Sequence, residues 1–170
     1  MTEGLKREWD FLYLDQEDVK RTGIDTKAAM AAVEQVLLEH AAGRLSMLPK
    51  VGAPLKEEYQ GNVFVLPEYM KSLDILGVRA GGVFINNRSV GLPSLVATTM
   101  ILDPQTGAPL AIMDASFLTA LRIGAMAGVA AKHLCKKTGN VVAIIGCGYK
   151  SEYELRAISS VVPITKVLVH

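Results

Sequence analysis

Cysteine is scarce in this 170-residue sequence, in which Cys135 and Cys147 are the two copies. Two cysteines cannot build the disulfide framework of a small secreted domain. Their spacing matches no zinc-binding motif, so we predict no metal site. The sequence therefore favours a protein kept in a reducing compartment, and we expect it in the cytoplasm.

An excess of charge of either sign is missing as well. Lysine and arginine number 18 against 17 aspartate and glutamate residues, and the formal net charge is +1. Such a balance offers no electrostatic basis for binding nucleic acid or an anionic membrane surface. The first ten residues lack the apolar core of a signal peptide, and no apolar run reaches the ~20 residues of a membrane-spanning helix. We therefore expect a small-molecule partner rather than a nucleic acid or a membrane.

The positive evidence begins with the segment from Asn140 to Ser151. Five apolar residues precede Gly146, Cys147 and Gly148, and a helix-compatible stretch follows. This order is typical of the first βαβ unit of a dinucleotide-binding domain. Gly146 would permit the tight turn, and Gly148 would let a pyrophosphate approach the N–H groups at the start of the helix. Ser151 occupies the third small position, where glycine or alanine is usual, so the match to the motif is incomplete.

The chain divides into two parts with different patterns. Residues 1–115 are predicted to form an α+β domain with a mainly antiparallel sheet, because they contain β-rich runs and no βαβ pattern. Residues 116–170 are predicted to form a connecting helix and the first βαβ unit of an incomplete Rossmann-type α/β domain. The strands expected in the first part are residues 11–14, 45–50, 62–66, 75–85, 95–102 and 109–113.

Helix-capping and turn-forming residues indicate where several of these elements begin or end. Asp15 is predicted to cap a brief helix, and Asp25 or Thr26 is predicted to cap a longer one. Gly43 is expected to end the longer helix. The composition of Asp103–Gly107 predicts a tight turn that joins the last two strands as an antiparallel hairpin.

Three arginines stand out from their surroundings. Arg44 precedes an apolar strand, Arg79 interrupts one, and Arg122 lies in a helix of small and apolar residues. A guanidinium at a buried site needs an anionic partner, because an unpaired buried charge is costly. Each arginine alone fits a structural ion pair or a side chain that reaches the solvent. Together with a nucleotide motif, they favour binding of a substrate carboxylate or a cofactor phosphate.

Other reactive residue types receive a plainer interpretation. His40 and His133 are expected on helix faces without a catalytic role, and the sequence shows no acidic partner for either. Cys147 is interpreted as a small substitute for alanine rather than as a reactive thiol.

Longer motifs occur in a consistent order along the chain. They are Asn87-Arg-Ser-Val-Gly-Leu-Pro93, the hairpin Leu102–Asp114 with its Thr-Gly-Ala-Pro-Leu-Ala core, the helix Leu118–Ala125, and the Gly-Cys-Gly turn. Residues 11–19 and Leu66–Tyr69 fit the same scheme. Together these motifs resemble the ornithine cyclodeaminase/μ-crystallin family over nearly the whole chain.

The resemblance implies the N-terminal part of an NAD(P)-dependent oxidoreductase or cyclodeaminase that acts on a small amino or imino acid. The cofactor would be NAD or NADP, and members are usually homodimers through the non-Rossmann domain. By position, the substrate carboxylate would be held by Arg44, Arg79 and Arg122. The cofactor-binding residues implied by position are Thr119, Gly146, Cys147, Gly148, Tyr149, Lys150 and Ser151.

Departures from the family pattern keep an alternative open. Arg79 stands where the family usually has lysine, and Ile123 replaces a threonine. Tyr149, Lys150 and Ser151 replace the usual x-Gln-Ala after the glycines. Members are about twice this length, so this truncated chain is expected to be inactive alone. The alternative is a non-catalytic μ-crystallin-like binding protein, or a subunit that completes a split enzyme with a companion chain.

Overall fold

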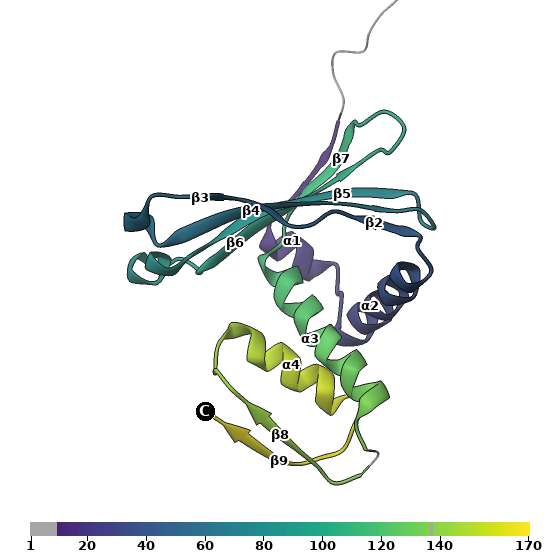
Figure 1. Cartoon of the computed structure of the whole chain (residues 1–170), viewed down its shortest axis with the longest axis vertical. Helices are drawn as coiled ribbons and strands as arrows, with labels where there is room; N and C mark the ends of the chain where they lie inside the picture. The colour runs from purple at the N-terminus through teal and green to yellow at the C-terminus, as the bar shows by residue number, and fades with distance from the viewer. Residues whose placement is uncertain (1–9, 137) are drawn as a thin grey trace, which may run out of the picture. The chain divides into compact units, whose positions relative to one another are not determined.

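The computed structural model describes residues 10–136 and 138–170, which separate into two compact units (Figure 1). Unit 1 contains the chain up to Asp18 and Arg44–Ser116, and unit 2 contains Val19–Gly43 and Phe117–His170. The first nine residues, which bear on the signal-peptide interpretation, lie outside the described residues. Within the described part, each helix is too short or too polar to cross a membrane.

Unit 1 is built on a seven-stranded sheet with the order β1-β7-β6-β5-β4-β2, to which β3 is added alongside β4. The pairing of β1 with β7 is parallel and the others are antiparallel. The predicted α+β class with a mainly antiparallel sheet is therefore confirmed. The strands are β1 (Leu12–Leu14), β2 (Leu45–Met47), β3 (Val51–Pro54), β4 (Gly61–Met70), β5 (Ile75–Phe84), β6 (Leu95–Leu102) and β7 (Pro109–Asp114).

The strand predicted over residues 45–50 is wrong in its extent. The chain instead forms two short strands, β2 and β3, on either side of Pro49. Proline has no N–H to donate to a sheet and restricts the residue before it, so it interrupts the ladder. Both short strands pair with β4, which is longer than predicted because it continues through Pro67 to Met70. Pro67 pairs with Val78 of β5 at a place where neither β2 nor β3 flanks β4.

The predicted hairpin between β6 and β7 is confirmed, and Asp103 organises its turn. The Asp103 carboxylate accepts hydrogen bonds from the backbone N–H of Gln105 at 2.7 Å and of Thr106 at 3.0 Å. Gly107 has a φ of 73° and donates its N–H to the Asp103 carbonyl at 2.8 Å. The backbone N–H of Thr106, and after it that of Gln105, hold the pKa of the Asp103 carboxyl below its ordinary value, because they stabilise its charged form.

Two helices, a short parallel sheet and a connecting helix make up unit 2. They are α2 (Thr26–Ala41), α3 (Ser116–Leu134), β8 (Asn140–Ile144), α4 (Tyr149–Ser159) and β9 (Ile164–Val169), and β8 pairs with β9 in parallel. The predicted strand–helix–strand order is therefore present. Asp25 caps α2 as expected, because its carboxylate accepts from the Ala28 N–H at 2.8 Å. The remaining helical segments of the chain are α1 (Gln16–Arg21), η1 (Glu57–Tyr59) and η2 (Ile85–Val90).

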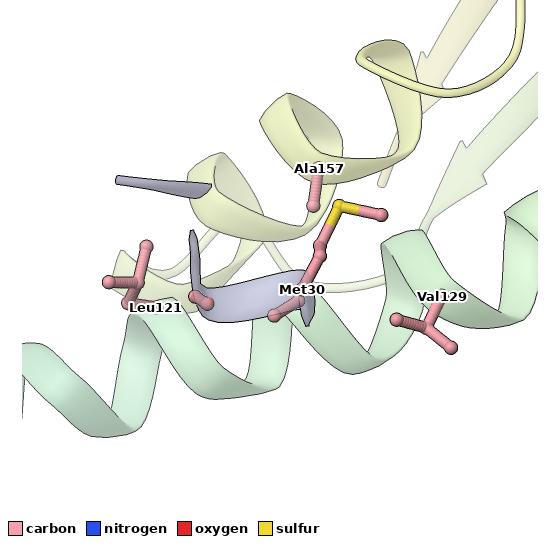
Figure 2. Close-up of a cluster of buried hydrophobic side chains, with 6 residues drawn as sticks. Met30, Leu121, Val129 and Ala157 are labelled. Carbon is pink, nitrogen blue, oxygen red and sulfur yellow. The ribbon is translucent and has the colours of Figure 1, made fainter. Parts of the chain in front are cut away.

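The core of unit 2 is built from small and flexible side chains. Figure 2 shows the buried cluster, in which Met30 of α2 lies between α3 and α4. Gly124 and Gly128 give α3 a flat surface, and α4 packs directly against it at Tyr153 and Ala157. This contact fixes α4 on α3, and α4 begins at the glycine turn. The buried members are Ala29, Met30, Leu121, Ala125, Val129 and Ala157.

Candidate dinucleotide and carboxylate site

The turn after β8 has the backbone geometry that a tight strand-to-helix connection requires. Gly146 has a φ of 94°, a left-handed conformation that disfavours other residues. Its N–H donates to the carbonyl of His170 at 2.9 Å, and the His170 N–H donates to the Ile144 carbonyl at 3.0 Å. The turn therefore begins beside the carboxyl end of β9. In open α/β sheets, ligands bind outside the carboxyl ends of parallel strands.

Gly148 leaves room for a ligand at the start of α4. A Cβ built at Gly148 would meet no atom within 4 Å, although its φ of −93° is accessible to any residue. Within the described residues, no side-chain hydrogen bond caps α4 at Gly148. The first N–H groups of a helix attract anions. These residues therefore fit a nucleotide pyrophosphate, with the backbone of residues 148–150 as its contact surface.

The other predicted cofactor residues, apart from Thr119, belong to this turn and the start of α4. Cys147, Tyr149 and Lys150 are exposed. The Ser151 hydroxyl donates to the Gly148 carbonyl at 2.5 Å, which ties the first turn of α4 together. Thr119 lies on α3 of the same unit and is 4% exposed.

The three arginines differ in how far they are exposed. Arg122 is exposed, and its Nη1 lies 3.6 Å from the Met126 sulfur one helical turn later. Arg44 is also exposed, whereas Arg79 is half-buried in β5. The Arg122 side chain therefore reaches the solvent from a helix of mostly apolar residues, and its neighbour Met126 is exposed as well. Arg44 and Arg79 belong to unit 1, and Arg122 belongs to unit 2.

Sequence reasoning missed a second cation beside Arg79. The ring of Phe64 in β4 is 5% exposed, with the Lys50 ammonium 4.1 Å and the Arg79 guanidinium carbon 5.5 Å from its centroid. Such contacts stabilise cations over aromatic faces. A shallow pocket of ≈ 310 Å³ lies against the paired strands β3 and β4 and is lined in part by Lys50 and Asn62. Pairing of Gly52 with Phe64 creates this arrangement, and nothing local in the sequence indicates it.

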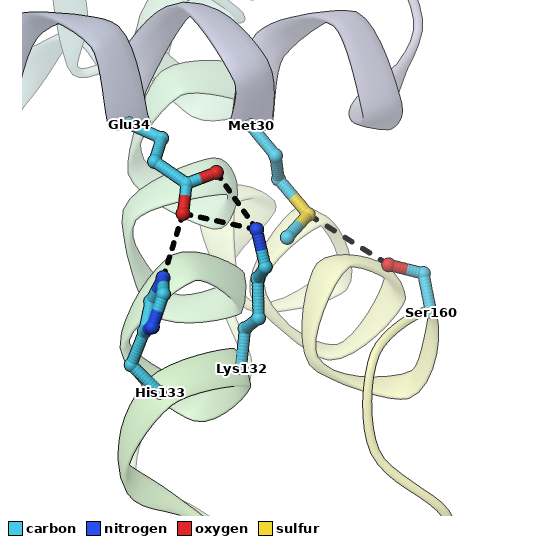
Figure 3. Close-up of polar contacts among 5 residues, drawn as sticks. All are labelled: Met30, Glu34, Lys132, His133 and Ser160. Carbon is cyan, nitrogen blue, oxygen red and sulfur yellow. Dashed lines mark hydrogen bonds and ion pairs between the residues drawn. The ribbon is translucent and has the colours of Figure 1, made fainter.

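The interpretation that His133 has no acidic partner is also wrong. Figure 3 shows Glu34 of α2 between Lys132 and His133 of α3. The Glu34 carboxylate lies 2.8 Å and 2.9 Å from the Lys132 ammonium and 2.6 Å from His133 Nε2. Hydrogen bonds from Lys132, then from His133, hold the pKa of Glu34 below its ordinary value. The cluster ties α2 to α3 and is structural.

Replacing Glu34 by glutamine is expected to flatten the acid side of the stability profile. Because the folded-state pKa of Glu34 is lowered, its stabilising effect is present above its unfolded pKa of about 4.5. That effect disappears as the pH falls through the lower folded-state pKa. Urea unfolding from pH 3 to pH 7 should therefore separate wild type from Glu34→Gln near neutrality and bring them together in acid.

The matched control is Glu152→Gln, which removes a carboxylate paired with Arg156 at 2.7 Å inside α4. It should have a smaller effect, because exposed pairs one turn apart in a helix contribute little. A constant difference between Glu34→Gln and wild type over the whole pH range would contradict the prediction.

The family to which the chain belongs follows from its similarity to known protein families. The profile of the ornithine cyclodeaminase/mu-crystallin family matches residues 12–170. The chain belongs to this family. The resemblance seen in the motifs is thereby confirmed, and it includes both units.

Individual members of the family show where this chain stands among them. It is 36% identical to alanine dehydrogenase of Archaeoglobus fulgidus over 156 residues, which are 92% of this chain and 47% of that enzyme. The structure of Thermococcus litoralis Δ1-pyrroline-2-carboxylate reductase in complex with NADH and L-proline superposes with a TM-score of 0.88 at 34% identity. That match covers 94% of this chain and 49% of the reductase. An archaeal alanine dehydrogenase dimer with bound NAD gives a TM-score of 0.86, also at 34% identity, over 94% of this chain and 48% of that one.

The chain therefore spans about half the length of the family members it matches. From residue 12 onward both units fall inside the matched part, as does the Gly146–Ser151 turn. The family's N-terminal half, which precedes and enters the Rossmann-type domain, is what this chain provides.

Proposed function

We propose that this chain provides the carboxylate-binding unit and the first nucleotide-binding βαβ unit of an NAD(P)-dependent enzyme of small amino or imino acids. The observation that carries the proposal is the glycine turn, with a φ of 94° at Gly146 and open space at Gly148. Similarity to a reductase in complex with NADH and L-proline supports the same assignment.

In this proposal each part of the chain has one task. The backbone of Gly146–Ser151 binds the cofactor pyrophosphate, Lys150 adds a positive charge, and Thr119 contacts the cofactor from α3. Arg44, Arg79 and Arg122 bind the substrate carboxylate and orient the adjacent carbon. A bound nicotinamide supplies the hydride chemistry.

Similar relatives indicate the chemical class of the substrate. Alanine dehydrogenase and Δ1-pyrroline-2-carboxylate reductase each act on a carbon that carries nitrogen and lies next to a carboxylate. Cationic side chains that bind the carboxylate also fix the position of the adjacent carbon, whichever amino or imino acid is bound. We propose a substrate of this class for the present protein, and we propose that the protein is located in the cytoplasm.

We also propose that unit 1 forms a homodimer through one face of its sheet. Val65 and Val96 are 43% and 44% exposed, and the strand register puts them on the same face as Ala80. Exposed apolar surface of this kind typically marks an interface. A related alanine dehydrogenase at 34% identity is a dimer, which supports the proposal.

A second candidate function is a binding or assembly protein that lacks catalysis of its own. The observation that favours it lies in unit 2, where one face of β8 and β9 exposes Val141 to 57% and Leu168 to 48%. A companion polypeptide that continues the parallel sheet would cover this face with the helices that connect its strands. Addition of a strand at a sheet edge is a common mode of such recognition.

Substitution of Arg122 by alanine tests the proposed enzyme role. Because the side chain is exposed, the free energy of unfolding should change by less than about 0.5 kcal/mol. Affinity for L-proline or L-alanine in the presence of NADH should fall about 10-fold to 100-fold, the loss of one charge-assisted hydrogen bond. Calorimetric titration and, in an active assembly, turnover would measure the effect.

The control is Arg156→Ala, which removes another exposed guanidinium in unit 2, paired with Glu152. It should leave amino-acid binding unchanged. Retention of carboxylate binding by Arg122→Ala, or its unfolding, would argue against the proposed role.

A further inference from the structure

A chain of three aromatic rings connects the start of α3 to the glycine turn. The centroids of Phe117 and Tyr153 are 6.1 Å apart with an interplanar angle of 70°. Those of Tyr153 and Tyr149 are 5.3 Å apart at 68°. Both pairs have the edge-to-face geometry that stabilises aromatic contacts. Tyr153 is the central ring and touches both of the others.

The hydroxyl groups of the two tyrosines add a polar contact at the outer end. Tyr149 Oη and Tyr153 Oη lie 3.2 Å apart, within hydrogen-bond distance. Since the residues are four apart in α4, the contact spans the first turn of this helix. Tyr149 is 57% exposed, so a bond to a fixed neighbour restricts a side chain that solvent would otherwise leave mobile.

Tyr153 itself is held on α3 by its backbone. A Cβ at Gly124 would lie 2.5 Å from the carbonyl carbon and oxygen of Tyr153, so the two helices touch at this point. Its ring also packs on Phe117, which is two residues before Thr119 and one turn before Leu121 of α3. Tyr153 is thus fixed by its backbone and by its ring.

The first turn of α4 needs such support. Helix ends fray because their N–H groups lack partners within the helix. In the described part of the chain, α4 has no side-chain cap at Gly148, and Tyr149 is its first residue. A ring that anchors Tyr149 therefore limits fraying of the helix turn that directly follows the open space at Gly148.

We propose that Tyr153 is a positioning residue for the dinucleotide turn: it holds Tyr149, and through it the first turn of α4, against α3. The proposal rests on the proposed cofactor site and adds residues outside the glycine motif to it. Phe117 is the fixed end of this aromatic chain, and Tyr149 is its end at the turn. In functional terms, cofactor binding at the glycine turn is coupled through Tyr153 to the position of α3. This helix carries Thr119 and Arg122.

The rate at which backbone N–H groups in the first turn of α4 exchange with solvent tests the proposal without requiring catalysis. It can be measured by NMR on the full chain. In Tyr153→Leu, which removes the central ring, the first hydrogen-bonded N–H groups of α4, those of residues 151–154, should exchange on the order of fivefold to tenfold faster, as expected for the loss of two aromatic contacts. The conservative Tyr153→Phe keeps both ring contacts and should restore most of the protection. NADH affinity, followed by calorimetry, should fall in the same order.

Two further variants make the result decisive if Tyr153→Leu fails to fold. Tyr149→Ala removes the exposed end of the aromatic chain and leaves Tyr153 packed on α3, so it should raise exchange in the turn but not in α3. The control Tyr69→Phe removes a tyrosine hydroxyl that bonds Asp74 at 2.7 Å in unit 1 and should leave the turn unchanged.

Unchanged exchange at residues 151–154 in Tyr149→Ala or Tyr153→Leu would overturn the proposal, whatever the NADH result. Faster exchange in both, with no NADH binding by the unsubstituted chain, would support the positioning role and contradict the cofactor site. The two ideas therefore fail by different measurements.

Discussion

A valine at position 148 is expected to remove nucleotide binding while leaving the chain folded. The Cβ of Gly148→Val meets no atom within 4 Å, and its backbone keeps a φ of −93°. The branched side chain would occupy the space where a pyrophosphate must approach the N–H groups of α4. Loss of two charge-assisted hydrogen bonds corresponds to an affinity lower by at least about 100-fold. Calorimetric titration with NADH measures it, and thermal unfolding checks the fold.

Serine at the same position separates binding from helix stability. Valine is a poor N-cap, so Gly148→Val should also lose about 1 kcal/mol of stability. Gly148→Ser supplies a good N-cap and should be at least as stable as wild type, yet its hydroxymethyl group enters the same space. If Gly148→Ser and Gly148→Val both bound NADH as wild type does, the pyrophosphate would have to lie elsewhere.

Alanine at position 124 should destabilise unit 2, although alanine favours helices. The added methyl group would lie 2.5 Å from the Tyr153 carbonyl carbon and oxygen, and backbone atoms cannot move aside as a flexible side chain can. Forced separation of packed helices typically costs up to about 3 kcal/mol, and the gain in helix propensity offsets about 1 kcal/mol. Urea unfolding should therefore show a net loss of about 2 kcal/mol.

Gly128 provides the matched comparison in the same helix. A methyl group there would meet the Ala157 Cβ and the Met30 sulfur at 2.9 Å, and the methionine side chain can move. Gly128→Ala should therefore lose less stability than Gly124→Ala. Equal or greater stability of Gly124→Ala relative to wild type would show that the helices separate at little cost.

Features that depend on neighbouring residues were predictable from the sequence. The cap at Asp25, the turn at Asp103–Gly107 and the strand–turn–helix order around Gly146 are set by a few adjacent residues. The structure shows each of them where the residue pattern placed it. Family membership followed for a related reason, since its motifs are short segments in a consistent order.

Features that join distant segments were not predictable. Glu34 contacts Lys132 and His133 across 98 and 99 residues, and no local pattern connects them. The approach of Lys50 to Phe64 depends on a strand that breaks at Pro49 and then pairs again with β4. The exposure of Arg122 could not be decided from the sequence for a different reason: small apolar neighbours do not tell which side of a helix faces solvent.

Unit 2 is assembled from segments far apart in the sequence, which has a consequence for synthesis of the chain. Met30 of α2 packs with Ala157 of α4, and its sulfur lies 3.7 Å from the hydroxyl of Ser160, a residue 130 positions later. At about 5–20 residues per second, a ribosome needs roughly 7 to 26 seconds to make the intervening chain. During that interval the apolar side of α2 has emerged without its partner helix. Unit 2 is therefore expected to fold late on the ribosome, and α2 is the segment for which a chaperone would compete.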